Sequence, residues 1–166
     1  FGSDSLISKQ EFFNYKYDVV YSENSNLAKI RDRFINDIKN IDIPKLEPAF
    51  KLMEDWDLSA DLENHSAAIC MIVLPNAFNI SDLDYDKNEI VEKLSETVDY
   101  FIQKFGKIDV PLGEVIRLVR GETNLPLSGG PDLLRAIYFE KKNDIYMGIG
   151  GDSYFQAVEW SPKGEL

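Results

Sequence analysis

Hydrophobic residues recur at helical spacing through the first two thirds of the chain, and capping residues mark where helices begin. Ser8 and Glu11 have the spacing of a capping box, in which the serine hydroxyl accepts from an amide three residues on and the carboxylate reaches back. This pattern predicts a short helix near the N-terminus. We expect its aromatic residues Phe12, Phe13 and Tyr17 to face inward.

Two more amphipathic helices are predicted to follow. Ser25 can cap a helix whose apolar residues, from Leu27 to Ile38, recur every three or four positions. Pro44 suits the first turn of the next helix, because the N–H that proline lacks has no partner there. The apolar stripe of that helix consists of Leu46, Phe50, Met53 and Trp56.

Two later segments complete the helical part. Residues 64–74, NHSAAICMIVL, are apolar on nearly every side, so this segment should occupy the centre of a bundle and end near Pro75. The clearest helical pattern covers residues 86–105, with its apolar residues on one side. Gly106 then stands where a left-handed residue often ends a helix.

After Pro111 the pattern changes to short runs of β-branched and aromatic residues separated by Gly, Pro and Lys-Lys-Asn-Asp turns. Helices first and strands last favour an α+β fold, with an N-terminal helical segment followed by a small antiparallel sheet. With 166 residues, of which 44% are hydrophobic, the chain fits one domain. We expect residues 1–110 to be mainly helical and residues 111–166 mainly antiparallel β.

Net charge, the length of the apolar runs and the single cysteine exclude several classes of function. The chain carries 18 basic and 29 acidic residues, a formal charge of −11, which disfavours binding to nucleic acid or to anionic membrane surfaces. No apolar run approaches the ~20 residues that a membrane span needs. The single cysteine, Cys70, lies in an apolar run and is expected to be a buried thiol.

The stretch GIGGDSYFQAVEW, residues 148–160, invites three interpretations: a phosphate-binding loop, the site of a nucleophile, or a turn before a strand. A dinucleotide fingerprint needs glycine where Ser153 stands, and its loop should lead into a helix. A serine triad would depend on His65, the only histidine, and the G-x-S-x-G elbow is absent. We therefore expect a hairpin turn at Gly150-Gly151 and a structural role for His65.

Residues 82–93 begin like a calcium-binding loop, with acidic residues at positions 1, 3 and 5. The match fails at position 6, where Lys87 replaces glycine, and at position 12, where Lys93 replaces the bidentate glutamate. A solvated acidic helix start explains the segment better than weak cation binding, and it would use Asp82, Asp84 and Asp86. One histidine and one cysteine cannot build a zinc shell, so no metal or other cofactor is expected.

Two other polar features have ordinary explanations. Arg117 and Arg120 are expected to pair with neighbouring carboxylates such as Glu114 and Glu122 rather than to clamp a substrate. The tripeptides Asn64-His65-Ser66 and Asn79-Ile80-Ser81 match the glycosylation sequon, which matters only in a secreted eukaryotic protein.

Four collinear stretches point to a family. They are residues 12–25 (FFNYKYDVVYSENS), 52–68 (LMEDWDLSADLENHSAA), 113–138 (GEVIRLVRGETNLPLSGGPDLLRAIY) and 150–160 (GGDSYFQAVEW). The last two resemble a late β-chain region of the penicillin acylase family, in the branch of the aculeacin and acyl-homoserine-lactone acylases. The first two resemble the helical region that precedes it, so the similarity covers nearly the whole chain in the family's order.

The resemblance implies a parent protein that is an N-terminal-nucleophile amidohydrolase. Such enzymes cut their own precursor to expose a serine, whose hydroxyl attacks an amide carbonyl while its α-amine acts as base. Backbone amides and an asparagine stabilise the oxyanion. Because this chain begins with Phe1, we expect the nucleophile and the oxyanion asparagine to precede it in the parent. By this resemblance, no catalytic residue of the family maps onto this chain, and the family places the stretch that contains Ser153 in structural strands.

The resemblance also implies partners and a location. The partners are the remainder of the parent acylase and, for that parent, a small acyl amide, whether β-lactam, lipopeptide or lactone. Export to a periplasm or secretion is implied, and calcium ligands of the family would come largely from other segments. Apolar surface that the chain exposes when it is separated from its parent predicts a homodimer through strand edges.

Two alternative functions remain beside the acylase fragment. The first is a self-contained, non-catalytic binding or structural domain, and the second is a hydrolase that uses Ser153 and His65.

Overall fold

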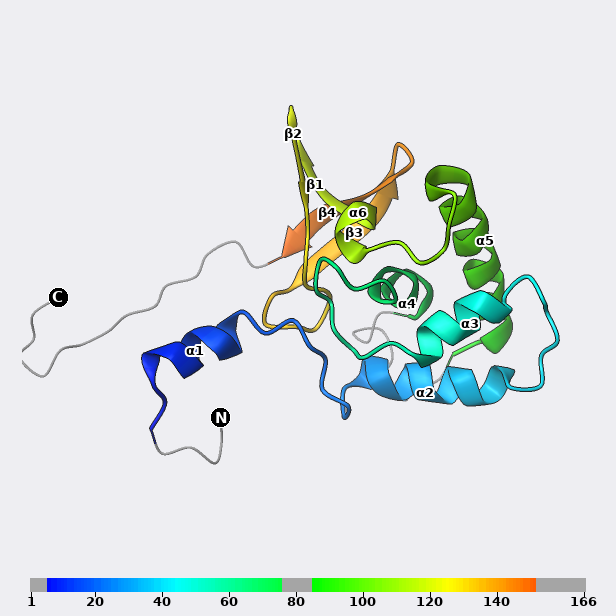
Figure 1. Cartoon of the computed structure of the whole chain (residues 1–166), viewed down its shortest axis with the longest axis horizontal. Helices are drawn as coiled ribbons and strands as arrows, with labels where there is room; N and C mark the ends of the chain where they lie inside the picture. The colour runs from blue at the N-terminus through cyan, green and yellow to red at the C-terminus, as the bar shows by residue number, and fades with distance from the viewer. Residues whose placement is uncertain (1–5, 76–84, 152–166) are drawn as a thin grey trace, which may run out of the picture.

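The structure is a computed structural model that describes residues 6–75 and 85–151. In these residues the helices precede the strands, as Figure 1 shows. The helices are α1 (Lys9–Lys16), α2 (Asn26–Ile38), α3 (Glu47–Glu54), α4 (Ala67–Val73), α5 (Lys87–Phe105) and α6 (Leu112–Val115). The strands are β1 (Ile116–Arg120), β2 (Thr123–Pro126), β3 (Ile137–Lys142) and β4 (Ile145–Gly151). The predicted α+β class is therefore confirmed.

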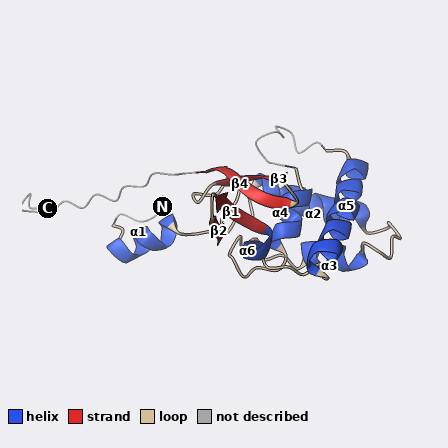
Figure 2. Ribbon diagram, turned by 90° about the horizontal axis from the view of Figure 1, so that it is seen from above, coloured by secondary structure: helices blue, strands red, loops and turns tan. Residues whose placement is uncertain are grey.

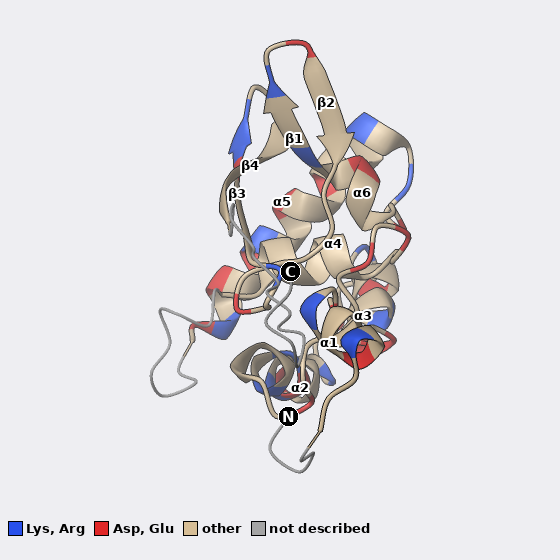
Figure 3. Cartoon of the chain, turned by 90° about the vertical axis from the view of Figure 1, so that its left-hand side faces the viewer, with Lys and Arg blue, Asp and Glu red and all other residues tan. Residues whose placement is uncertain are grey.

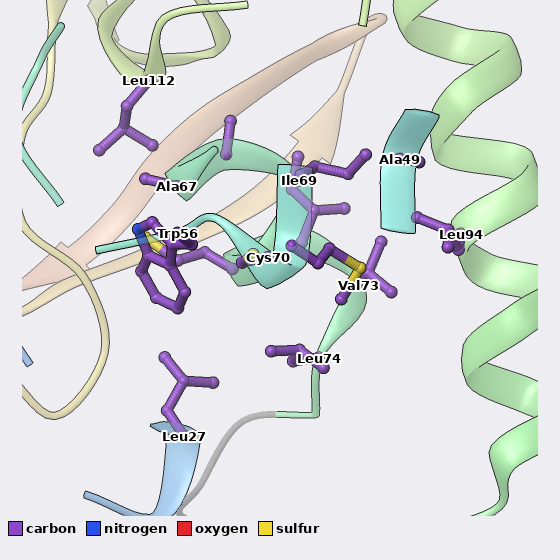
Figure 4. Close-up of a cluster of buried hydrophobic side chains, with 14 of the residues drawn as sticks. Leu27, Ala49, Trp56, Ala67, Ile69, Cys70, Val73, Leu74, Leu94 and Leu112 are labelled. Carbon is purple, nitrogen blue, oxygen red and sulfur yellow. The ribbon is translucent and has the colours of Figure 1, made fainter. Parts of the chain in front are cut away.

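α4 lies at the centre of the molecule, with α2 and α3 on one side, α5 on another and the sheet above it in the view of Figure 1. All seven of its residues are buried, as the apolar segment predicted. Figure 4 shows Ile69 and Val73 directed toward Ala49 of α3 and Leu94 of α5. The helix ends at Leu74, whose extended backbone is the conformation favoured before a proline.

α4 carries no charged side chain, whereas the helices around it do (Figure 3). It is nevertheless only seven residues long. Across residues 6–75 and 85–151, no helix combines the length and the apolar character needed to cross a bilayer.

α2 and α5 begin and end where their sequences predicted. The Ser25 hydroxyl accepts from the backbone N–H of Ala28 at 3.2 Å, and the Asp86 carboxylate accepts from that of Asn88 at 2.8 Å. Gly106 ends α5 with φ 73°, the left-handed conformation expected there. Each helix buries one apolar face in the core shared with α4.

α3 starts later than predicted. Pro44 belongs to the turn before the helix, and Pro48 occupies the first helical turn instead. Both prolines fit a helix start by their missing N–H, so the pattern alone could not choose between them. The predicted stripe is still directed inward, since Leu46, Met53 and Trp56 are buried.

α1 has the predicted capping box but not the predicted packing. The Ser8 hydroxyl and the Glu11 carboxylate each accept a backbone N–H of the other residue, at 3.2 and 2.8 Å. No residue of α1 is buried, and Phe12 and Tyr17 are 41% and 58% exposed. Figures 1 and 2 show the helix standing beside the body of the molecule. The expectation of an inward-facing aromatic side was wrong, because a capping box fixes only where a helix begins.

The sheet has the order β2-β1-β4-β3 and is mixed. β1 and β2 form one antiparallel hairpin, and β3 and β4 form another. The hairpins meet through a parallel pairing of β1 with β4, with Ile116 opposite Tyr146. A purely antiparallel sheet was therefore the wrong prediction. Hydrophobic runs identify strands, but they do not show which strands from separate hairpins become neighbours.

The turn between β3 and β4 lies at Asn143 and Asp144, which have φ values of 49° and 59°. Two positive φ values at the centre of a two-residue hairpin loop match a type I′ turn. The Lys-Lys-Asn-Asp turn predicted from the sequence is therefore present, whereas the further turn predicted at Gly150-Gly151 was wrong, because both glycines lie in β4, paired with Tyr138 and Ile137. The following stretch, residues 152–160, lies outside the described residues.

Candidate functional site

Of the two residues considered for a serine hydrolase, only His65 can be placed. Ser153 lies outside the described residues. His65 is exposed, and its Nδ1 lies 2.6 Å from the carbonyl oxygen of Asp109. Nδ1 must carry the proton for this contact to be a hydrogen bond. The imidazole thereby joins the start of α4 to the segment before α6, which is the structural role predicted for it.

Arg117 and Arg120 do not form the predicted ion pairs. The Arg117 guanidinium donates to the side-chain and backbone oxygens of Asn124, at 2.8 and 3.0 Å, and to the carbonyl of Gly113 at 2.7 Å. Arg120 donates to the carbonyls of Val119 and Gly148, at 2.7 and 3.2 Å. Arg117 therefore ties α6 and β1 to β2, and Arg120 ties β1 to β4.

Only residues 85–93 of the segment that resembles a calcium-binding loop are described by the structure. Asp82 and Asp84 lie outside the described residues, as does the sequon at Asn79, and Asp86 is the cap of α5. The part of the chain that the structure describes contains no group of three or more His, Cys, Asp or Glu side chains arranged to hold a metal ion. Asn64, in the other sequon, uses its side-chain oxygen to accept from the N–H groups of Ser66 and Ala67.

Cys70 is buried, as predicted. Burial raises the pKa of its thiol, because the thiolate would lose its hydration in the apolar centre of α4. A protonated, enclosed thiol is a poor nucleophile. Cys70 is therefore a core residue rather than a reactive one.

Three of the four stretches that resemble the penicillin acylase family meet at one place. We call it the junction and define it as residues 19–21, 58–60 and 129–131. Tyr21 N–H donates to the Leu58 carbonyl at 3.0 Å, and Ala60 N–H donates to the Val19 carbonyl at 2.8 Å. Gly129 N–H donates to the Ala60 carbonyl at 2.9 Å, which attaches the third stretch to the other two.

The Tyr21 side chain completes the junction. Its hydroxyl donates to the carbonyl oxygen of Pro131 at 2.7 Å, across 110 positions of sequence. Its ring is buried and makes an edge contact with Trp56 at a centroid distance of 5.7 Å. Burial raises the pKa of Tyr21, and the negative charge of Asp132 and the neighbouring phenol of Tyr138 add to the effect. The phenol therefore keeps its proton and remains a donor.

The two glycines of the junction cannot easily be replaced. A Cβ on Gly130 would collide with the Tyr21 hydroxyl and lie 2.6 Å from Cε of Met71 in α4. Gly129 has φ 98°, which side-chain-bearing residues rarely adopt, and its Cβ would strike the Arg135 carbonyl. The Ser-Gly-Gly-Pro segment thus needs both glycines for the loop to approach Tyr21 and α4.

Backbone strain also occurs at the junction. Leu58 has φ 66°, a left-handed conformation that costs a non-glycine residue roughly 1–2 kcal/mol. Its side chain is buried, and its carbonyl accepts from Tyr21. Strain of this kind persists only where the surroundings fix it, so the junction is a rigid point of the fold.

A second set of bonds continues from the junction to the sheet. Gly113 N–H donates to the Leu62 carbonyl and Leu112 N–H to the Asn64 carbonyl, each at 2.9 Å. These bonds place α6 and the start of β1 against the segment 61–64. The stretch 52–68 is therefore connected to the stretch 113–138 at two places, Gly113 and Gly129.

A cavity of about 370 Å³ adjoins the junction, between the helices and strands β3 and β4. Its wall is mainly apolar, with two charged residues, Lys93 and Asp132. The residues that line it are Leu27, Met71, Ile72, Leu74, Pro75, Lys93, Pro131, Asp132, Tyr138, Phe139, Tyr146 and Ile149. Sequence reasoning identified neither this cavity nor the junction; the Gly129-Gly130 pair was the one local signal for the junction.

Comparison with known proteins adds no family to this picture. No family model matches the chain, and a search of curated proteins finds no match to it. The resemblance to the penicillin acylases therefore depends on the four stretches themselves.

Proposed function

We propose that this chain is a late β-chain segment of a penicillin-acylase-type amidohydrolase, and that it supports the enzyme's structure without supplying its catalytic side chains. The observation that carries the proposal is the junction. It supports the proposal because three of the four stretches, far apart in the sequence, share backbone hydrogen bonds at one buried, glycine-dependent contact.

In the proposed parent enzyme, the chemistry belongs to a serine at the N-terminus of the mature β-chain. Its Oγ bonds to the amide carbon, its α-amine takes the hydroxyl proton, and the amine product leaves as the acyl-enzyme forms. Water then releases the carboxylic acid and restores the serine. The substrate is an acyl amide, and export to a periplasm or secretion remains part of the proposal.

The role proposed for this chain is to hold the parent's fold in place. α4 and the junction connect the helical layer to β1, β3 and β4, so a change there should alter how much enzyme folds. It should leave the rate constant of correctly folded enzyme unchanged, because no junction residue is proposed to touch the reacting atoms.

The test uses the complete protein encoded by the reading frame that contains these residues. We expect it to hydrolyse at least one member of a panel of β-lactam, lipopeptide and acyl-homoserine-lactone substrates. Gly130→Ala should lower the yield of active enzyme, with kcat per titrated active site unchanged. Gly150→Ala is the matched control, since the nearest atom to its added Cβ is 4.0 Å away. Absence of hydrolysis across the panel would contradict the proposal.

A second candidate function is a self-contained, non-catalytic binding domain. It is favoured by one observation: helices α2 to α6 and β1 share a single continuous core, and a cavity opens beside it. If the complete protein is inactive while the purified 166-residue chain unfolds cooperatively and binds a small molecule, this candidate replaces the first.

A further inference from the structure

The cavity beside the junction is built from both layers of the fold. α2 contributes Leu27, the end of α4 contributes Met71, Ile72 and Leu74, and the strands contribute Phe139 and Tyr146. Figure 4 shows Leu27 and Leu74 on neighbouring elements at this side of the core. Its volume of about 370 Å³ falls in the range of small-molecule sites, about 300–1,000 Å³. Because the walls of the cavity are mainly apolar, they favour binding of the apolar part of a ligand.

The two charged residues of the cavity come from different parts of the fold. Lys93 lies on α5, where the charge that acts on it is that of Glu89, one turn away. Asp132 acts on Tyr21 and so lies toward the junction. A ligand with one charged end would therefore meet opposite charges depending on its orientation.

The Lys93 ammonium is available to a ligand. Lys93 is exposed and lines the cavity, yet desolvation lowers the pKa of its ammonium, which indicates that this group is partly withdrawn from water. Within residues 6–75 and 85–151, no hydrogen bond or ion pair engages it. The phenol of Tyr146 lines the same cavity, and burial raises its pKa, so it stays protonated and able to donate.

We infer that this cavity binds a small amphiphilic carboxylate, with its apolar body between α4 and the sheet and its carboxylate against the ammonium of Lys93. The negative charge of Asp132, which lies toward the junction, repels the carboxylate and so favours the contact with Lys93. An ammonium facing a carboxylate forms a charge-assisted hydrogen bond, stronger than one between neutral groups. The inference does not depend on the proposed amidohydrolase role.

The experiment compares three probes that share one alkyl chain and differ in head group: octanoate, 1-octanol and octylamine. Calorimetric titration of the protein at neutral pH should show saturable binding of octanoate, at least about tenfold tighter than octanol, a difference of about 1.4 kcal/mol. Octylamine should bind most weakly. Equal affinities for octanoate and octanol, or a preference for octylamine, would overturn the inference, and so would octanoate binding that does not saturate.

Variants of the protein distinguish the contribution of the ligand's head group to the affinity from that of its apolar chain. Lys93→Met should weaken octanoate about tenfold and leave octanol unchanged. Lys107→Met, which removes the same charge at an exposed position away from the cavity, should change neither. Ile149→Trp, which adds an indole to the cavity wall, should weaken octanoate and octanol alike. If Lys93→Met and Lys107→Met bind octanoate equally, the assignment of the carboxylate to Lys93 is wrong.

Discussion

α1 and α4 are nearly the same length, eight and seven residues, yet they are stabilised in opposite ways. α1 has a complete capping box and buries no residue. In α4 the Ser66 side chain makes no cap hydrogen bond, and every residue is buried. Short helices are marginal in water without tertiary packing. The difference shows that local signals place the start of a helix, whereas burial decides whether the fold depends on it.

The sharpest test of this comparison is a truncation in each helix. Ile69→Ala removes a fully buried side chain of α4 and should lower the free energy of unfolding by about 2–5 kcal/mol. Phe12→Ala in α1 should change it by less than about 0.5 kcal/mol, because that ring is not packed into the core. Urea titration followed by tryptophan fluorescence measures both. Similar losses for the two variants would show that α1 is part of the core.

The buried region should also respond to alkaline pH. Burial, with Asp144 and Tyr146 nearby, raises the pKa of Tyr100 from 10.0 to about 12. Between these values the unfolded state binds fewer protons at this residue than the folded state, so the contribution of Tyr100 to stability is unchanged below pH 10 and falls as pH rises toward 12. One such group contributes at most about 1.4 kcal/mol per pH unit.

Urea midpoints between pH 9 and 12 would measure this loss. Tyr100→Phe should make the pH dependence shallower, and the remaining slope would come from Tyr21, Tyr85 and Tyr146, whose pKa values are also raised. A slope that is the same in the variant and the wild type would exclude Tyr100 as a contributor.

The same contrast between packed and open positions can be tested at the glycines of the junction and of β4. Gly130→Ala places a methyl group against Tyr21 and Met71 and should destabilise the protein by about 1–3 kcal/mol, the usual cost of overpacking. Gly150→Ala, in an open part of β4, should cost less than about 1 kcal/mol. Thermal unfolding of the two variants provides the comparison. If Gly130→Ala does not change the stability, the loop does not approach Tyr21 and α4 as closely as described.

The Tyr21 hydroxyl should have a smaller effect. Tyr21→Phe keeps the ring against Trp56 but leaves the Pro131 carbonyl without its donor, a loss of about 1 kcal/mol. Tyr17→Phe removes a hydroxyl from an exposed ring and is the matched control. Chemical denaturation of both should place the loss in Tyr21→Phe alone.

The smallest effect on global stability belongs to the cap of α1. Ser8→Ala breaks the capping box, which is worth about 1 kcal/mol to the helix itself. The free energy of global unfolding should still change by less than about 0.5 kcal/mol, because α1 buries nothing in the core. Hydrogen exchange should show faster exchange confined to residues 9–16. Faster exchange spreading into α2 or α4 would contradict this independence.

Sequence patterns succeeded where the determining interactions are local or where burial surrounds a whole segment. Ser25, Asp86 and Gly106 act within one turn of their helices, and the apolar segment of α4 left few alternatives to a central position. The same patterns predicted the Lys-Lys-Asn-Asp turn but also a turn at Gly150-Gly151 that is absent, because glycine is equally compatible with a turn and with an irregular strand. They also gave no information on the parallel pairing of β1 with β4, which depends on how two hairpins pack.

The junction and the cavity could not be predicted for a related reason. Tyr21 reaches Pro131 across 110 positions, and no local spacing encodes that contact. Lys93 was considered only as a failed calcium ligand, because its position beside β3 and β4 depends on the docking of α5 against the sheet. The family resemblance named the stretches that form the junction without indicating that they touch.

The most direct test of the proposed role is the intact mass and N-terminal sequence of the complete protein after expression. We predict two chains, the second beginning with serine and containing the residues described here. Replacing that serine with alanine should leave a single uncleaved chain. A wild-type protein that remains one chain, with no serine at a new N-terminus, would contradict its assignment to the penicillin-acylase-type amidohydrolases.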